Sequence, residues 1–326
     1  MSRILSGIQP TGSFHLGNYL GAIQNWVRLQ DEYEAFYSIV DLHALTTRPS
    51  AEDLREGTHA LAIAVLASGV DPEKAVLFVQ SAVPEHSELA WVFQCLTQLG
   101  DLNRMTQFKD KSEQMQGNIN AGLFTYPVLQ AADIAIYRAT HVPVGEDQVQ
   151  HLELTREIIR RFTHHYGELF PEPQVVISKA PRVMGLDGKS KMSKSKNNYI
   201  GVLETPDQVR KKLRSAVTDP QRVRRDDPGR PEVCNIWALH QLFTSEEKRA
   251  EIYEGCTTAT MGCVDCKGIL AEGICKVTEP IRERALVLEG EPDKVKDILR
   301  DGQKRASAEA RKTMDQVKER CGLWRG

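Results

Sequence analysis

The pattern of apolar and polar positions changes character near residue 203. Before it, short apolar segments alternate with longer amphipathic ones, and the sequence predicts five strands, at Ile4–Ser6, Ala35–Val40, Ala75–Gln80, His141–Val144 and Gln174–Ser178. The second and third of these are almost continuously apolar, which is typical of parallel strands buried on both faces. Helices are predicted in between, over Leu16–Gln30, Ala51–Ser68 and Pro84–Thr97. The alternation indicates an α/β fold with a doubly wound, Rossmann-like parallel sheet.

The last part of the chain carries helical patterns only, over Pro206–Ser215, Ile236–Leu242, Ser245–Tyr253, Ile269–Glu289 and Ala306–Glu319. We therefore expect two domains, a sheet domain over residues 1–203 and an all-helical domain over residues 204–326. Basic residues gather at this boundary, at Arg210, Lys211, Lys212, Arg214, Arg222, Arg224 and Arg225. A solvated helix face is the ordinary explanation of such a charge run, and an RNA-binding patch is the alternative.

Composition narrows the class of protein. The 326 residues are 41% hydrophobic and 26% charged, which is ordinary for a globular chain and excludes wholesale disorder. No apolar run approaches the roughly 20 residues that a membrane-spanning helix needs, and the N-terminus lacks a secretory pattern. We therefore expect a cytoplasmic protein without a membrane partner. The net charge of −2 argues against a general polyanion binder, although a local patch remains compatible with RNA.

The cysteines are clustered. Four of the seven, Cys234, Cys256, Cys263 and Cys266, fall within 33 residues, and Cys275 follows nearby. Disulfides are not expected in the cytoplasm, so the clustering favours a metal ion or a metal cluster. Thiolates hold both zinc and iron–sulfur clusters, so the ligand type does not separate the two. Four inert buried thiols are the remaining alternative.

Two further motifs suit phosphate chemistry. The turn after the first strand, residues 9–18, reads QPTGSFHLGN, and its glycines allow a ligand to approach the backbone at the start of a helix. His15 and Asn18 are three residues apart there, so both project to one side. Residues 191–195 read KMSKS in a glycine-flanked loop. Two lysines in such a loop form a cationic clamp for a triphosphate whose leaving group gains charge.

HLGN after the first strand and KMSKS after the last resemble class I aminoacyl-tRNA synthetases. The segments ILSGIQPTG, VDLHALT, MTQFKDKS, YPVLQAADI and VPVGEDQVQHLELTR are similar to tryptophanyl-tRNA synthetases in particular, and the match spans nearly the whole chain. The resemblance implies a homodimeric ligase that joins L-tryptophan to ATP with Mg²⁺, releases pyrophosphate and transfers tryptophan to tRNA-Trp. The amino-acid carboxylate is itself the nucleophile, so catalysis requires positioning and charge stabilisation rather than a general base.

The resemblance also implies roles for single residues. The implied catalytic residues are His15, Asn18, Lys111, Lys191 and Lys194. The implied ATP-binding residues are Gln9, Gly17, Asn18, Gly145, Asp147, Lys191, Met192, Ser193 and Lys194. The implied tryptophan-binding residues are Leu5, Gln9, His43, Tyr126, Gln130, Asp133, Val142, Val144 and Gln148.

Asp133 is the sharpest specificity candidate, because it lies in a largely apolar helical window. A buried carboxylate without a partner costs several kcal/mol, so a donor must satisfy it. The residues alone favour a structural aspartate with a partner inside the protein. The resemblance implies instead that the indole N–H of tryptophan is the donor.

The sequence departs from the common pattern of these enzymes at three places. His15 stands where many bacterial members have threonine, and Gln130 stands where many have methionine. The cysteine cluster is absent from most members and resembles the minority that bind a [4Fe–4S] cluster beside the anticodon-binding region. Its first spacing, with 21 intervening residues, is one residue shorter than in that group, so Cys275 is a competitor for Cys234, and Zn²⁺ is the alternative occupant.

Three other functions are weighed against this one. A nucleotidylyltransferase shares the first motif but has neither the long helical part nor the full KMSKS. A tyrosyl-tRNA synthetase is a closer relative and differs in the amino-acid pocket. A non-catalytic RNA-binding paralogue is expected to lack the phosphate-binding residues, whereas His15, Asn18, Lys191 and Lys194 are all present.

Overall fold

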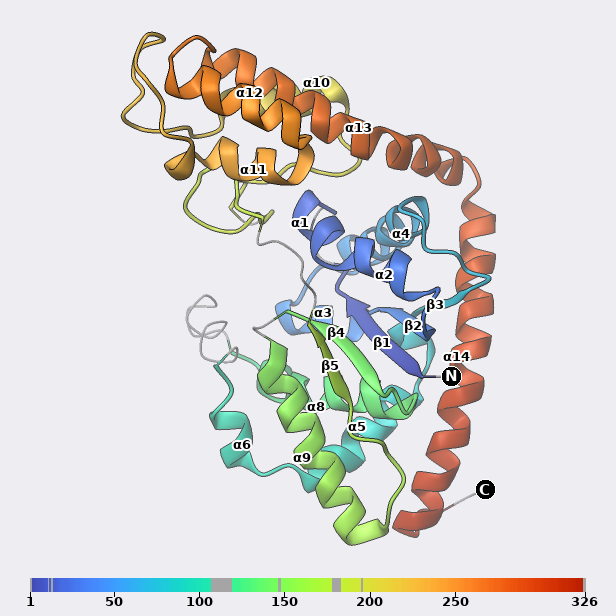
Figure 1. The fold of residues 1–326 in the computed structure, drawn as a ribbon. Coiled ribbons are helices and arrows are strands. Elements are labelled where there is room, and N and C mark those ends of the chain that lie inside the picture. Colours follow the sequence, from blue (N-terminus) through green and yellow to red (C-terminus); the bar gives the residue numbers. More distant parts are fainter. Residues whose placement is uncertain are drawn as a thin grey trace.

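The computed structural model describes residues 2–10, 12, 14–106, 119–145, 148–177, 183–194 and 196–324. A parallel sheet of five strands lies at its centre (Figure 1), in the order β3-β2-β1-β4-β5. Its strands are β1 (Arg3–Ile8), β2 (Glu34–Ile39), β3 (Ala75–Val79), β4 (His141–Val144) and β5 (Gln174–Ile177). The predicted doubly wound α/β fold is confirmed. All five predicted strands are present, and Ser178, the last residue of the predicted fifth strand, lies outside the described residues.

Successive residues of a strand point to opposite sides of the sheet. Both sides carry apolar residues here, and helices cover both. Ile4 and Tyr37 pack in one core with α1 (Leu16–Asn18), the π-turn η1 (Tyr19–Ile23), α2 (Gln24–Leu29) and α4 (Ala51–Ala67). Leu5 and Phe36 pack in the other core with α5 (Glu85–Leu96), α8 (Ala121–Ile136) and α9 (Val149–Tyr166). The short elements are α3 (Asp41–Ala44), η2 (Leu45–Thr47), η3 (Gln80–Ala82) and α6 (Leu99–Asn103). The single helix predicted over Leu16–Gln30 is thus interrupted by a π-turn, a feature often found at functional sites.

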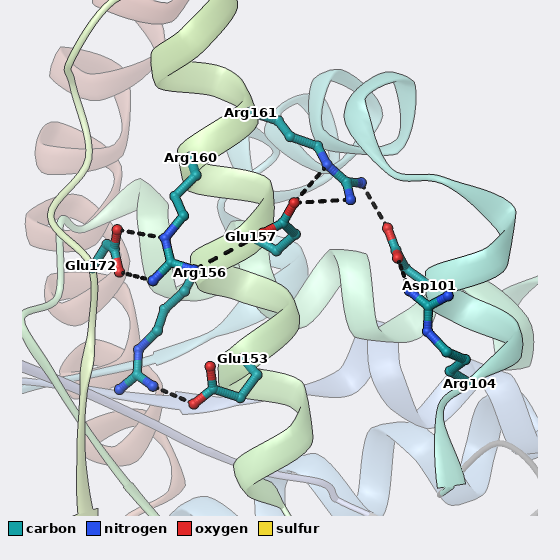
Figure 2. A network of polar contacts seen from close by, with 8 residues as sticks. All are labelled: Asp101, Arg104, Glu153, Arg156, Glu157, Arg160, Arg161 and Glu172. Atoms are coloured by element: carbon teal, nitrogen blue, oxygen red, sulfur yellow. Dashed lines mark hydrogen bonds and ion pairs between the residues drawn. The ribbon is translucent and has the colours of Figure 1, made fainter.

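Ion pairs on the outer face of α9 hold neighbouring segments in place (Figure 2). Arg161 contacts Glu157 on its own helix and Asp101 of α6, whose carboxylate also pairs with Arg104. The Arg160 guanidinium forms a two-point contact with Glu172, in the segment that leads to β5. Exposed ion pairs stabilise a fold only slightly. Asp101, however, is only 9% exposed and forms ion pairs with two arginines. These contacts fix α6 beside α9.

The helices α10 to α13 form a group at one end of the sheet (Figure 1). They are α10 (Pro206–Ser215), α11 (Asn235–Phe243), α12 (Glu246–Thr257) and α13 (Cys263–Glu289), with the short η5 (Pro231–Val233) before α11. Thr205 begins α10 with a capping box, in which its side chain and that of Gln208 satisfy two backbone N–H groups. No helix among the described residues is both long and apolar enough to cross a membrane.

The last helix, α14 (Pro292–Cys321), runs back along the sheet (Figure 1). It contacts the edge strand β3 and also α5, and Ala306, Ala310 and Met314 are buried in the second core. A Cβ atom at Gly302 would lie 1.8 Å from the carbonyl oxygen of Leu77, so only glycine allows this approach. The helix therefore covers the edge strand. Although its sequence belongs to the predicted helical domain, α14 packs against the predicted sheet domain.

Candidate functional site: two adjoining pockets and a cysteine-lined cavity

The sheet opens between β1 and β4. These strands are paired only at Ile4 and His141, whereas β1 and β2 are paired at six successive positions. The strand order reverses at this point, and in doubly wound folds ligands bind at such a crevice beyond the carboxyl ends of the strands. A cavity of about 300 Å³ occupies the crevice. We call it the first pocket.

The first pocket brings together every residue that the sequence implied for tryptophan. Its lining includes Leu5, Gln9, His43, Tyr126, Gln130, Asp133, Val142, Val144 and Gln148, and also Gly145 from the implied ATP set. The strands β1 and β4 contribute Leu5, Val142 and Val144 to the lining, and α8 supplies Tyr126, Gln130 and Asp133. Two buried polar atoms of the lining, Ser38 Oγ and Trp26 Nε1, have no hydrogen-bond partner among the described residues.

The Asp133 carboxylate is already satisfied within the protein. Its Oδ2 atom lies 2.9 Å from His43 Nε2, and its Oδ1 atom lies 2.7 Å from His86 Nδ1. Gln80 Nε2 lies 2.8 Å and 2.9 Å from the two oxygens. Burial raises the pKa of Asp133, but the hydrogen bonds from His43 and His86 outweigh it and lower the pKa to about 2. Asp133 is therefore an anion at neutral pH.

The residues alone favoured a partner for Asp133 inside the protein, and three side chains of the protein supply such donors. The indole donor that the resemblance implied would be an additional partner. Gln80 and His86 were missed, because they follow β3 in the segment QSAVPEH, which has no motif character. The only signal in the sequence was a pair of polar residues close to a buried apolar strand. Asp133 and His43 still line the first pocket.

A third buried histidine supports Tyr126. The Tyr126 hydroxyl lies 2.9 Å from His151 Nε2, and His151 is fully buried. The phenol ring is therefore fixed at the wall of the first pocket. His151 is another residue that the sequence argument did not single out.

A second cavity of about 440 Å³ adjoins the first. Gln9 lines both cavities, so they meet at the end of β1. Asn18 and Gly12 also line the second pocket. A Cβ atom at Gly12 would lie 3.6 Å from Cβ and Cδ of Lys194, which places the second lysine of KMSKS against the turn after β1.

His15 and Asn18 shape that turn by capping each other. His15 Nδ1 accepts a hydrogen bond from the Gly17 N–H at 3.1 Å, and Asn18 Oδ1 accepts one from the His15 N–H at 3.1 Å. Burial lowers the pKa of His15, which favours the neutral ring. Because Nδ1 accepts, the proton of the neutral ring is on Nε2, which is a donor. Met192 packs beside Gly17, so it joins the KMSKS loop to the turn.

The KMSKS loop is held by a buried asparagine. Asn198 is 3% exposed; its Nδ2 donates to Asp187 Oδ2 at 2.9 Å, and its Oδ1 accepts from the Ser193 N–H at 2.8 Å. Asn235 of α11 donates to the Gly185 carbonyl and so connects the loop to the helical group. Lys191 and Lys194 are exposed, whereas the Met192 side chain is buried in the core. Of the remaining predicted site residues, Lys111 and Asp147 lie outside the described residues, as does Ser195 of the motif.

The four clustered cysteines face one small cavity. Cys234, Cys256, Cys263 and Cys266 line it together with Arg222, Thr218, Ile236 and Met261. Arg222 lies with a guanidinium nitrogen 3.5 Å from Cys256 Sγ, and a Cβ atom at Gly229 would lie 2.4 Å from the same sulfur. Burial, followed by the neighbouring cysteines, raises the pKa of Cys266 to about 12. Cys275 lines a different, open groove between α10 and α13.

The number and type of these thiols fit a metal site, but their present arrangement is closed. Among the described residues, no three His, Cys, Asp or Glu side chains are arranged to hold a metal ion. The cavity between the thiols is about 20 Å³, hardly larger than one water molecule needs.

The comparisons with known proteins agree with this architecture. The family model of class I tRNA synthetases for tryptophan and tyrosine matches residues 1–278. The chain is 52% identical to the tryptophan–tRNA ligase of Deinococcus radiodurans over 99% of both chains. It is 47% identical to that of Thermotoga maritima over 98% of this chain and 99% of the relative. A crystal structure of the Campylobacter jejuni tryptophanyl-tRNA synthetase with ADP and tryptophan superposes with a TM-score of 0.89 at 35% identity, over 98% of this chain and 100% of the other.

The chain therefore belongs to the class I aminoacyl-tRNA synthetases of the tryptophan and tyrosine group. Identities of this size over nearly the full length of both chains decide between the two amino acids. Within the group, its family is that of the tryptophan–tRNA ligases.

Proposed function

We propose that the two adjoining pockets carry out tryptophan activation, with tryptophan in the first pocket and ATP in the second. As a tryptophan–tRNA ligase, the protein joins L-tryptophan to ATP, releases pyrophosphate and transfers tryptophan to tRNA-Trp. The observation that carries the site assignment is the convergence of all nine implied tryptophan residues on one cavity at the switch point of the sheet.

The shared wall at Gln9 explains how the reactants meet. A tryptophan with its indole between β1 and α8 directs its carboxylate toward the mouth of the first pocket, where Gln9 and Gln148 supply polar contacts. An α-phosphate in the second pocket lies on the other side of Gln9. Attack of the carboxylate then needs no general base, and the rate comes from holding the two groups in line.

The groups that stabilise the leaving pyrophosphate come from two sides. The neutral His15 ring donates from Nε2, and Lys191 and Lys194 extend from the loop that Asn198 and Met192 anchor. Mg²⁺, which enters with the nucleotide, neutralises charge on the phosphates. These groups stabilise charge that develops in the transition state, which is the main lever in phosphoryl and adenylyl transfer.

The decisive experiment is ATP–pyrophosphate exchange measured against all amino acids. We expect exchange that depends on tryptophan and on Mg²⁺. Equal exchange with tyrosine, or exchange without an amino acid, contradicts the assignment, and the first result favours the tyrosyl alternative. Retained tRNA binding without any exchange favours the non-catalytic paralogue.

Asp133→Asn tests the specificity wall of the first pocket. A carboxylate oxygen that faces the indole favours tryptophan over an amino acid without that N–H, because only tryptophan donates a further hydrogen bond to it. We expect a smaller ratio of kcat/KM for tryptophan over tyrosine. An unchanged ratio removes Asp133 from the amino-acid pocket.

We also propose that the cysteine-lined cavity holds a [4Fe–4S] cluster, with Zn²⁺ as the alternative. Support comes from four thiols on one cavity, a glycine where a side chain would meet a sulfur, and a guanidinium beside the thiols. A zinc ion needs all four sulfurs about 2.3 Å from one point. A four-iron cluster is larger than a single zinc ion and keeps its cysteine sulfurs farther apart.

Metal analysis of anaerobically purified protein separates these outcomes. We expect brown protein with iron and sulfide, and oxidative loss of the cluster should impair tRNA charging more than pyrophosphate exchange. Colourless protein with stoichiometric zinc supports the alternative, and metal-free protein with full charging activity leaves the cysteines as inert thiols.

Three broader expectations complete the proposal. We propose that the helical part from residue 204 reads the anticodon of tRNA-Trp, which the basic residues near α10 support.

A homodimer is proposed because large apolar side chains are exposed, with Trp91 of α5 at 67% and Leu99 of α6 at 70%. Sedimentation of the wild type and of Trp91→Glu tests it. A cytoplasmic location is supported by the seven cysteines, none of which is paired in a disulfide.

A further inference from the structure

A chain of buried polar groups extends from the Asp133 carboxylate away from the first pocket. His86 Nδ1 lies 2.7 Å from Asp133 Oδ1, and His86 Nε2 lies 2.8 Å from the Tyr137 hydroxyl. His86 and Tyr137 are both fully buried, at 0% exposure. Neither of them lines the first pocket, whereas Asp133 does. These hydrogen-bonded side chains therefore contact the carboxylate on the side away from the first pocket.

The donor and acceptor roles along this chain follow from the charge of Asp133. An ionised carboxylate only accepts, so His86 Nδ1 carries the proton and donates to it. In the neutral ring, His86 Nε2 accepts and the Tyr137 hydroxyl donates to it. Burial raises the pKa of Tyr137 well above its ordinary value, so the phenol keeps this proton. By the same argument His43 donates to Asp133 from Nε2.

Gln80 contributes a third donor at a structural cost. Its amide nitrogen lies within 2.9 Å of both Asp133 oxygens, while its Oε1 atom is buried without a partner among the described residues. An amide that turned over would place that oxygen against the carboxylate, which is repulsive. The orientation of Gln80 is thus set by Asp133.

Aromatic packing holds the side chains of His86 and Tyr137 in place. The Tyr137 ring stacks on Phe36 with centroids 4.6 Å apart, and the His86 ring stacks on Phe78 at 5.9 Å. These rings belong to the core between the sheet and α5 and α8. The carboxylate has little freedom to rotate, because each of its oxygens is bonded to a group that the core immobilises.

We propose that His86, with Gln80 and Tyr137 behind it, is a positioning residue that sets the specificity of the first pocket. It holds Asp133 ionised and turned so that an oxygen edge faces the indole N–H of the substrate. This inference rests on the proposed function, in which Asp133 reads that N–H. His86 touches no reactant, so it acts through Asp133 alone.

The test uses a tryptophan analogue that lacks only the indole donor. In β-(3-benzothienyl)alanine a sulfur atom replaces the ring N–H, so the ratio of kcat/KM for tryptophan over the analogue in pyrophosphate exchange measures the hydrogen bond to Asp133. A merely structural residue lowers both kcat/KM values alike and leaves the ratio unchanged. A positioning residue changes the ratio.

We expect His86→Leu to lower this ratio by about tenfold or more, because the carboxylate loses a charge-assisted bond and its orientation. His86→Asn retains a donor near the position of Nδ1 and should restore the ratio to within about threefold of the wild type. His164→Leu, at an exposed position of α9, is the matched control and should leave the ratio unchanged. Gln80→Met removes the amide donor to Asp133 and leaves no other side chain unpaired, because the Gln80 amide oxygen has no partner among the described residues. It therefore tests the same role if His86→Leu does not fold.

The outcomes separate this inference from the proposal beneath it. If Asp133→Asn lowers the ratio but His86→Leu and Gln80→Met do not, the positioning role is wrong and the pocket assignment stands. If Asp133→Asn also leaves the ratio unchanged, both the reading of the indole and the positioning role fail. If the wild type shows no exchange with tryptophan, the proposed function itself fails.

Discussion

Gly302 is the position where one methyl group should separate α14 from the sheet. A Cβ atom there would lie 1.8 Å from the Leu77 carbonyl oxygen and 2.7 Å from its carbonyl carbon. Both are backbone atoms of β3, so neither can turn aside. To reach ordinary contact at 3.4 Å, α14 must move outward by roughly 1.5 Å, and such a gap forfeits more than half of each dispersion contact, since about 0.5–1 Å already forfeits a quarter to a half.

The expected cost of Gly302→Ala follows from this geometry. Overpacking a tight contact costs about 1–3 kcal/mol, and the displaced helix also loosens Ala306, Ala310 and Met314, each at most 1% exposed. The higher helix propensity of alanine returns up to about 1 kcal/mol. We expect a net loss, seen as a thermal midpoint that is lower by a few degrees in circular dichroism.

Gly268→Ala is the matched control. Gly268 lies inside α13, is exposed, and an added Cβ meets nothing within 4 Å. The same substitution should therefore raise the thermal midpoint slightly, by the helix propensity gain of about 0.5–1 kcal/mol. If both variants shift the midpoint upward, α14 is not held against β3 as described and the reasoning is refuted.

Three further outcomes are expected. Lys194→Ala should lower the single-turnover rate of adenylate formation by about 10²–10³ with little change in the KM for tryptophan; Lys196→Ala in the same loop is the control, and a fall below about tenfold counts against the clamp. Asn198→Ala removes four hydrogen bonds of the KMSKS loop, so exchange should slow while tryptophan binding, followed by fluorescence titration, is retained; weakened tryptophan binding of equal size argues against a local effect. The pKa of Asp133 is lowered from 3.8 to about 2, so its ionisation stabilises the fold by roughly 2 kcal/mol above about pH 4 and this contribution is lost as the pH falls toward 2. In urea unfolding, the stability difference between the wild type and Asp133→Asn should shrink over that range, and a constant difference contradicts the ionised state.

The sequence by itself determined the local elements and the order of the motifs. Strand and helix periodicities depend on neighbouring residues, and so do the turn after β1 and the glycine-flanked KMSKS loop. The five strands, the parallel sheet and the succession of helices after residue 203 could therefore be predicted. The resemblance carried by the motifs selected nine residues that converge on one pocket, although they come from segments far apart in the chain.

Only the tertiary structure decided which groups satisfy one another. The donors to Asp133 come from positions 90, 53 and 47 residues away, in elements whose own patterns say nothing about one another. The closed arrangement of the four cysteines and the docking of α14 on β3 depend in the same way on how separate elements pack. The periodicity of a helix shows that it has an apolar face, but not which surface that face covers. The partner is chosen by shape and by burial of polar groups, which exist only once the chain has folded.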